Sequence, residues 1–292
     1  LLFGFTHASN GAITLSIDYS LDSNGFFTDG DGSTAVIKKA ALEAAAGVLE
    51  SIITDSVGAM PAGAGGLFNT WSITGTHPGT GAGGTVFDVN PTIAADTLVI
   101  YAGGRALGGS TLGQGGPGGF SAGNGGLGDF TAFVDNIRNR GEAGITDGAG
   151  TALATQTDFA PWGGTITFDN DPAGQWHYDH TTAVTAGKSD FYSVALHELT
   201  HVLGIGIANS WTTKVTGGGG VFTGANSTTS NGGANPGVNA GGDHFVNGIM
   251  SVTLAGSIAQ EAMMDPSLTV GSRKLFTNLD AMGLSDIGWD VN

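Results

Sequence analysis

The strongest constraint on the fold is the apolar stretch 190–204, which also contains two histidines and a glutamate. The spacing of its apolar residues predicts one helix, with Ser189 or Asp190 capping its start and Gly204 ending it. Those residues cover most of the helix surface, which predicts burial: Val194, Ala195, Leu196, Leu199, Val202 and Leu203. Polar side chains buried on such a helix need a partner, so the fold has to supply one.

The polar residues of this helix have the spacing of a metal site. His197 and His201 are four residues apart, so their imidazoles lie on one face, one turn apart. Two neutral imidazoles in this arrangement suit zinc. Glu198 is adjacent to the first histidine, where its carboxylate can accept a proton from water at such a metal. The alternative is a surface helix with two solvated histidines, and the apolar neighbours argue against it.

Charge and composition exclude several classes of function. The net charge is −16 and the isoelectric point is about 4.4, so we expect no nucleic-acid partner and no attraction to anionic membranes. The absence of cysteine excludes disulfides and thiolate ligands. No stretch approaches about 18 consecutive apolar residues, so we expect no membrane span. These properties suit a secreted or cell-surface protein, and many exported bacterial proteins share them.

Glycine is far above average usage, with 53 residues and no three-residue period. The glycines cluster between apolar segments, which predicts long loops on a folded scaffold, including a glycine loop at 103–128 and a surface insertion at 217–242. The patterns elsewhere predict strands at 13–19, 97–101 and 165–168 and helices at 34–53, 129–140 (closed by Gly141) and 275–286. No linker or internal repeat divides the chain, which predicts a single domain over 1–292.

The stretch from Asp190 to Gly204 resembles the zinc helix of metzincin proteases, and of the matrixin branch in particular. Gly204 is placed where that clan turns its chain toward the third zinc ligand. The segment 163–171, followed by Trp176, is similar to the matrixin strand and calcium-binding turn. Residues 263–266 resemble the methionine turn that lies under the zinc, and 279–289 the closing helix. The resemblance covers roughly residues 160–206 and 260–290 in the right order, whereas the first 150 residues match only in their opening strand and helix.

This resemblance implies an α+β metzincin-like catalytic domain, with a twisted mixed sheet, long helices and glycine-rich loops. Its upper part would be 1–206, with the zinc helix at 190–204. Its lower part would be 207–292, with a loop insertion at 208–243 and the methionine turn near 263–266. The substrate cleft would lie between the two parts.

One position departs from the clan pattern and leaves the third zinc ligand open. The pattern places a histidine or aspartate three residues after the glycine, where this chain has Ile207, which cannot bind zinc. We expect His244, the one histidine beyond His201, to be returned to the metal by the insertion. The alternative is that His244 is an ordinary loop histidine. In that case Glu261, or less favourably His177 or His180, would be the third ligand.

The resemblance implies hydrolysis of peptide bonds in a protein or peptide substrate. Zinc would polarise the scissile carbonyl and activate water, and Glu198 would act as general base and pass the proton to the leaving amine. Met264 would form a packing floor. Some relatives have a tyrosine where this chain has Pro266, so no oxyanion-stabilising residue stands out. Tyr178 and Tyr192 are candidates without a distinguishing signal.

Two acidic turns are candidate calcium sites. Asp169, Asn170 and Asp171 offer hard oxygen ligands at the end of a strand, with Asp179 nearby in sequence. A second set has a spacing unlike that of an EF-hand: Asp22, Asn24, Asp29 and Asp31. The alternative for both is a solvated acidic turn.

Two rival functions also fit these residues. The chain could be a structural or surface-layer protein that keeps the fold and its metal without proteolysis, or a zinc hydrolase of non-peptide substrates. A zinc site with an open fourth position favours an enzyme, whereas a closed four-ligand site favours the structural role.

Overall fold

The computed structural model describes residues 13–28, 32–60, 68–126, 128–140, 159–171 and 175–292. Its centre is a four-stranded mixed sheet in the order β1-β4-β7-β5. Strands β1 (Thr14–Asp18), β4 (Thr97–Arg105) and β7 (Gly163–Asp169) are parallel, and β5 (Gly113–Pro117) is the antiparallel edge strand. Strand β7 is buried along its whole length, as expected for a central strand covered on both faces.

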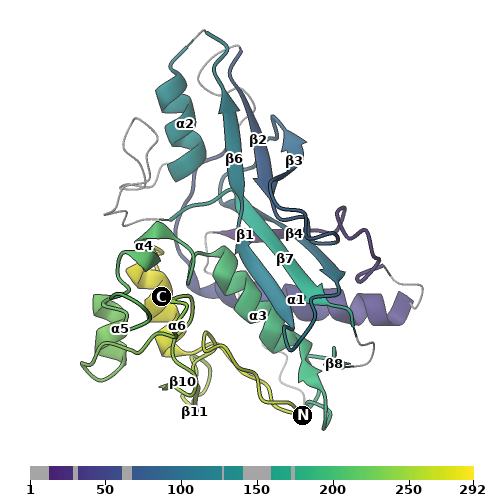
Figure 1. Cartoon of the computed structure of the whole chain (residues 1–292), viewed down its shortest axis with the longest axis vertical. Coiled ribbons are helices and arrows are strands. Elements are labelled where there is room, and N and C mark those ends of the chain that lie inside the picture. The colour runs from purple at the N-terminus through teal and green to yellow at the C-terminus, as the bar shows by residue number, and fades with distance from the viewer. Residues whose placement is uncertain (1–12, 29–31, 61–67, 127, 141–158, 172–174) are drawn as a thin grey trace.

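Two helices, α1 (Gly32–Ile52) and α3 (Phe191–Val202), pack against each other and against this sheet (Figure 1). They confirm the helices predicted at 34–53 and in the 190–204 stretch. Asp190 caps α3, because its carboxylate accepts a hydrogen bond from the backbone N–H of Ser193 at 3.1 Å. Nearly every side chain of α3 is buried, so this helix is held rigidly between the sheet and the rest of the chain.

The glycine loop predicted at 103–128 is wrong. Strand β4 extends to Arg105, and β5 and β6 (Gly119–Gly123) occupy much of the remaining stretch. The glycines allow α3 to pass close to β5: a Cβ atom at Gly113 would lie 2.6 Å from Glu198 Oε1. Strands of this composition have no alternation of apolar and polar side chains, so the hydrophobic pattern could not indicate them.

A second sheet rises beyond the first (Figure 1), in the order β3 (Thr85–Val89), β2 (Thr70–Gly75) and β6. It shares a small separate core with helix α2 (Phe130–Asn139), formed mainly by Trp71, Ile73, Phe133, Ile137 and Trp162. The predicted closure of α2 by Gly141 lies outside the described residues. Arg140 caps its C-terminus in the left-handed conformation, and its buried guanidinium donates to the carbonyl oxygens of Thr97 and Ala94.

The chain after α3 forms short elements: α4 (Asn209–Thr212), α5 (Ala225–Ser230), β10 (Met250–Val252), β11 (Ala259–Glu261) and α6 (Asn278–Asp286). The predicted insertion is therefore partly helical. Its helix α5 packs on α6, where Asp286 accepts hydrogen bonds from the backbone N–H groups of Asn226 and Ser227. Trp289 Nε1 donates to the carbonyl oxygen of Leu203 at 2.7 Å, which ties the final segment to the end of α3.

The two-residue strands β8 (Trp176–His177) and β9 (Ser189–Asp190) pair in parallel just before α3. No helix in the described ranges is both long and apolar enough to cross a membrane.

Candidate metal centre

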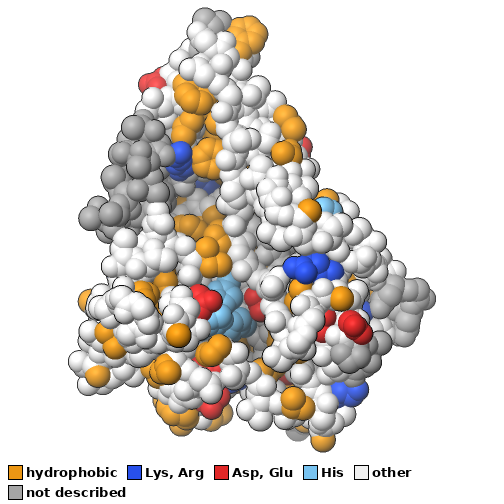
Figure 2. Space-filling model, in the orientation of Figure 1, with side chains coloured by type: hydrophobic (Ala, Val, Ile, Leu, Met, Phe, Trp, Pro, Cys, Tyr) orange, Lys and Arg blue, Asp and Glu red, His pale blue; other side chains and the backbone are white. Residues whose placement is uncertain are grey.

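Three histidines from two separate segments meet in the structure. Helix α3 supplies His197 and His201, and the loop that follows the insertion supplies His244. The Nε2 atom of His244 lies 3.0 Å from Nε2 of each of the other two, which are 3.1 Å apart. Figure 2 shows histidine side chains gathered in a hollow near the centre of the visible face.

The hydrogen-bond partners of the three rings define their tautomers. The Nδ1 atom of His197 lies 2.9 Å from the carbonyl oxygen of Met263, and that of His201 lies 2.8 Å from the carbonyl oxygen of Ile205. His244 Nδ1 lies 2.9 Å from Asp243 Oδ1. Since each partner is an acceptor, each neutral ring carries its proton on Nδ1 and directs the lone pair of Nε2 toward the other two rings.

This donor set fits zinc. Three converging lone pairs with no proton between them repel one another unless a cation lies among them. Nitrogen ligands at about 2.0–2.1 Å from a tetrahedral zinc are roughly 3.3 Å apart, close to the separations of these Nε2 atoms. Among the described residues, no other His, Cys, Asp or Glu joins the three histidines, so a bound ion would keep an open coordination position.

Burial keeps two of these histidines neutral. It lowers the pKa of His197 well below its ordinary value of 6.5, and the charges of His201 and His244 lower it further. Burial, and then His244, lower the pKa of His201 to about 4. Neutral imidazole is the form that binds metal, so the cluster is ready to bind a cation near neutral pH.

Glu198 is buried beside the cluster and lines the same cavity. Burial raises the pKa of its carboxyl group to about 8, against the opposing effect of a hydrogen bond from the backbone N–H of Gly115. A cation on the histidines would lower this pKa again, because a nearby positive charge favours the carboxylate. The group is therefore placed to take up and release a proton close to any bound metal.

The cavity over the histidines has a volume of about 760 Å³. Its lining includes residues 110–115, which contain the start of β5, and residues 265–268 with Lys274. Ile207, at the position where the clan pattern has its third ligand, is 43% exposed and also lines the cavity. The three histidines and Glu198 all line this cavity.

The turn at 263–266 lies against the cluster through its backbone. The carbonyl oxygen of Met263 contacts His197, and Met264 is fully buried. The Asp280 carboxylate accepts hydrogen bonds from the N–H groups of both methionines at 2.9 Å, which fixes the turn. Sequence reasoning missed this role of Asp280, although its spacing from Thr277 is that of the capping box that begins α6.

The other residues considered for the third ligand lie elsewhere. Glu261 forms an ion pair with Lys274 at 3.0 Å. His177 Nε2 contacts the carbonyl oxygen of Asp179, and the ring of His180 stacks beside Tyr192. Neither Tyr192 nor Tyr178 lines the cavity. The structure thus brings His244, and none of these alternatives, to His197 and His201.

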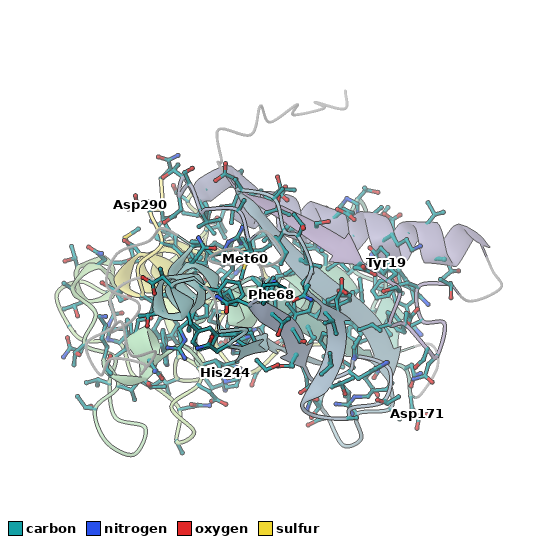
Figure 3. The ribbon with its side chains drawn as sticks, turned by 90° about the horizontal axis from the view of Figure 1, so that it is seen from above. Tyr19, Met60, Phe68, Asp171, His244 and Asp290 are labelled. Atoms are coloured by element: carbon teal, nitrogen blue, oxygen red, sulfur yellow. The ribbon has the colours of Figure 1, made fainter. Side chains whose placement is uncertain are left out.

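Hydrogen bonds account for the first acidic turn without an ion. The Asp169 carboxylate accepts from the backbone N–H groups of Leu107 and Asp171 and from Gln175 Nε2. Residues 172–174 lie outside the described residues. Figure 3 shows Asp171 well away from His244, so this turn is separate from the histidine cluster.

The second acidic turn is also held by its own hydrogen bonds. Asp22 accepts from the N–H groups of Phe26 and Phe27, and Asn24 Nδ2 donates to the carbonyl oxygen of Gly104. Asp29 and Asp31 lie outside the described residues. Nothing in the described part of the chain supports calcium at either turn.

Comparison with known proteins gives a match to a protein family. The model of the Matrixin family matches residues 132–212, which include α3 with its two histidines and glutamate but not His244. No curated protein and no solved structure matches the chain. The mixed sheet and helices are compatible with a matrixin-type domain. The family is zinc-dependent, and its match together with the three-histidine site supports a metzincin-like metalloprotease domain in this chain.

Proposed function

We propose that this chain is a secreted zinc-dependent endopeptidase in which His197, His201 and His244 hold the metal and Glu198 is the general base. One observation supports this most: three Nε2 lone pairs converge beside a buried carboxylate in an open cavity. The acidic, cysteine-free composition suits an exported protein, and the Matrixin match supports proteolysis.

Zinc held by the three histidines would polarise a scissile carbonyl and lower the pKa of water. Glu198 would take the proton from the attacking water and deliver it to the leaving nitrogen. Both transfers need a Glu198 carboxyl group whose pKa lies near the working pH. The Gly115 N–H holds the Glu198 carboxylate on the cavity side of α3. The carbonyl oxygens of Met263 and Ile205 keep the two α3 histidines in the metal-binding tautomer.

The position of β5 favours an extended peptide as substrate. This strand is at the edge of the sheet, with β7 on one side and the cavity beside its first residues. A peptide can add to such an edge through main-chain hydrogen bonds. Gly113 and Gly115 lie against Glu198 of α3, so this edge passes directly beside the candidate general base.

The structural or surface-layer alternative is less well supported. A structural zinc site is closed by four protein ligands, whereas three side chains converge here within the described residues and face an open cavity. A zinc hydrolase of non-peptide substrates would have the same open site. Cleavage of a protein substrate distinguishes it from an endopeptidase.

The deciding experiment measures bound metal and cleavage of casein or gelatin by wild type, Glu198→Gln and Glu43→Gln. We expect about one zinc per chain in all three proteins and loss of cleavage by about 100-fold or more in Glu198→Gln alone. Glu43 is the matched control, because it is exposed on α1. A wild type that binds zinc but cuts neither protein would contradict proteolysis, and one that binds no zinc would contradict the whole proposal.

A further inference from the structure

His244 differs from the other two histidines in the partner of its Nδ1 atom. His197 and His201 each contact a neutral backbone carbonyl, whereas His244 contacts a carboxylate oxygen, Asp243 Oδ1, at 2.9 Å. A carboxylate is the stronger acceptor, because the hydrogen bond to it is assisted by charge.

This difference in the Nδ1 partner follows the kind of segment that carries each histidine. The two α3 histidines are oriented by a buried helix, so their directions are fixed before any metal binds. His244 lies in a turn between Asn239 and Phe245 that belongs to no helix or strand. The direction of its ring therefore depends on the groups that the ring contacts, which are the rings of His197 and His201 and the Asp243 carboxylate.

Asp243 is itself held by Asn239. Asn239 Nδ2 donates to Asp243 Oδ1 at 2.7 Å, and Asn239 Oδ1 accepts from the backbone N–H groups of Asp243 and His244 at 3.2 and 3.3 Å. The backbone N–H of Asn239 closes the turn on the carbonyl oxygen of His244 at 3.0 Å. One asparagine therefore orders both the carboxylate and the backbone that bears the histidine.

Two glycines lie close to Asp243, whose side chain is half exposed. Gly206, at φ +83°, lies against the backbone of Asp243, where a Cβ atom would overlap the carbonyl oxygen. A Cβ atom on Gly241 would lie 2.9 Å from Asp243 Oδ1. The turn is anchored beyond the ligand by Phe245, which is fully buried and whose N–H donates to the carbonyl oxygen of Met264 at 3.0 Å.

We propose that Asp243, held by Asn239, is a positioning residue that fixes the His244 ring for the metal and strengthens it as a ligand. Acceptance of the Nδ1 proton by a carboxylate fixes the tautomer with a free Nε2 and makes that nitrogen more basic. The inference rests on the proposed zinc site and adds a residue that does not itself touch the metal. It explains how a loop can hold His244 as firmly as helix α3 holds His197 and His201.

The test measures the dissociation constant for zinc by competition with a chelator, on metal-free protein reloaded with zinc alone. Asp243→Asn keeps an oxygen that accepts from Nδ1 but removes the charge, and Asp243→Ala removes both. Asp88→Asn is the matched control, because Asp88 is exposed on β3 and its loss changes the net charge equally. Melting of each metal-free variant shows that it is folded, and ¹⁵N NMR shifts of the His244 ring report its tautomer.

We expect zinc affinity to fall by about 10–100-fold in Asp243→Ala and by less in Asp243→Asn, with Asp88→Asn unchanged. The NMR shifts of His244 in Asp243→Ala are expected to show a mixture of tautomers. Wild-type zinc affinity in both Asp243 variants would overturn the inference while leaving the zinc site intact. Absence of zinc from the wild type would instead overturn the proposed function, and the inference with it.

Discussion

A Cβ atom on Gly115 would overlap the main-chain carbonyl oxygen of Glu198, so at this point the backbone of the edge strand lies directly against the backbone of the candidate catalytic helix. The same glycine donates its N–H to the Glu198 carboxylate. The glycine at this position therefore sets both the distance between β5 and α3 and the place of the general base.

The first prediction concerns this close approach. We expect Gly115→Ala to lower the free energy of unfolding by about 1–3 kcal/mol, because the added methyl group forces β5 away from α3. Cleavage of casein should fall as well, because the displacement of β5 moves the backbone N–H of residue 115 away from the Glu198 carboxylate. Urea unfolding followed by tryptophan fluorescence measures the first effect.

Gly47→Ala is the matched control for this substitution. Gly47 is in the interior of α1, and a Cβ atom there would meet no other atom within 4 Å. The change should stabilise the chain by about 0.5–1 kcal/mol, because alanine favours the helix. If Gly115→Ala proved as stable and active as wild type, the close contact would have no consequence.

The helices could be predicted from the sequence, whereas the glycine-rich strands could not. Side chains such as Leu42 and Leu49 recur along α1 at helical spacing and are buried, so the pattern reports the packing directly. Strand β5 consists of glycines, a glutamine and a proline, and its place is set by contacts with β7 and α3. Contacts between distant segments leave no local pattern in the sequence.

The second prediction separates the candidates for the third zinc ligand. His244→Ala should weaken zinc binding by more than the roughly 100-fold that is typical of losing a supporting residue, because a direct ligand is lost. Glu261→Ala should retain zinc, because the structure pairs Glu261 with Lys274. Zinc content after dialysis against a weak chelator measures both. Zinc loss in Glu261→Ala with retention in His244→Ala would reverse the assignment.

The candidate site was predictable only where its residues share a helix. His197 and His201 follow from a spacing of four, because one helical turn fixes their relative position. The sequence places His244 at the metal only by elimination. The path of the insertion between α3 and His244 depends on packing, such as that of Phe245 against Trp211. Asp280 was missed for the same reason: it reaches Met263 across a gap of 17 residues.

The third prediction concerns the start of α3. Asp190 is fully buried, caps the helix and forms a two-point ion pair with Arg273, whose Nη2 and Nε lie 2.7 and 2.9 Å from its carboxylate oxygens. Arg273→Met should destabilise the chain by about 3 kcal/mol, because it leaves a buried carboxylate without its partner. Urea unfolding measures the loss.

Arg273→Lys tests whether geometry or charge matters at this pair. A lysine keeps the charge but cannot make the two parallel hydrogen bonds, so we expect only part of the stability to return. Full recovery with lysine would show that the charge of residue 273 alone stabilises Asp190.

The last prediction concerns the metal-free protein in acid. Burial lowers the pKa of His201 from 6.5 to about 4 in the folded chain, so the unfolded chain binds a proton there that the folded chain refuses. The stability linked to this residue is fully present above pH 6.5 and is lost as the pH falls toward about 4, by at most about 1.4 kcal/mol per pH unit. The free energy of unfolding of chelator-treated wild type should therefore fall more between pH 7.5 and pH 5 than that of His201→Asn, which has no titrating ring. Equal slopes in the two proteins would contradict a neutral, buried His201. Saturating zinc should raise the wild-type stability and leave its slope at least as steep, because bound metal keeps the nitrogens of the folded chain unprotonated while the unfolded chain still takes up protons.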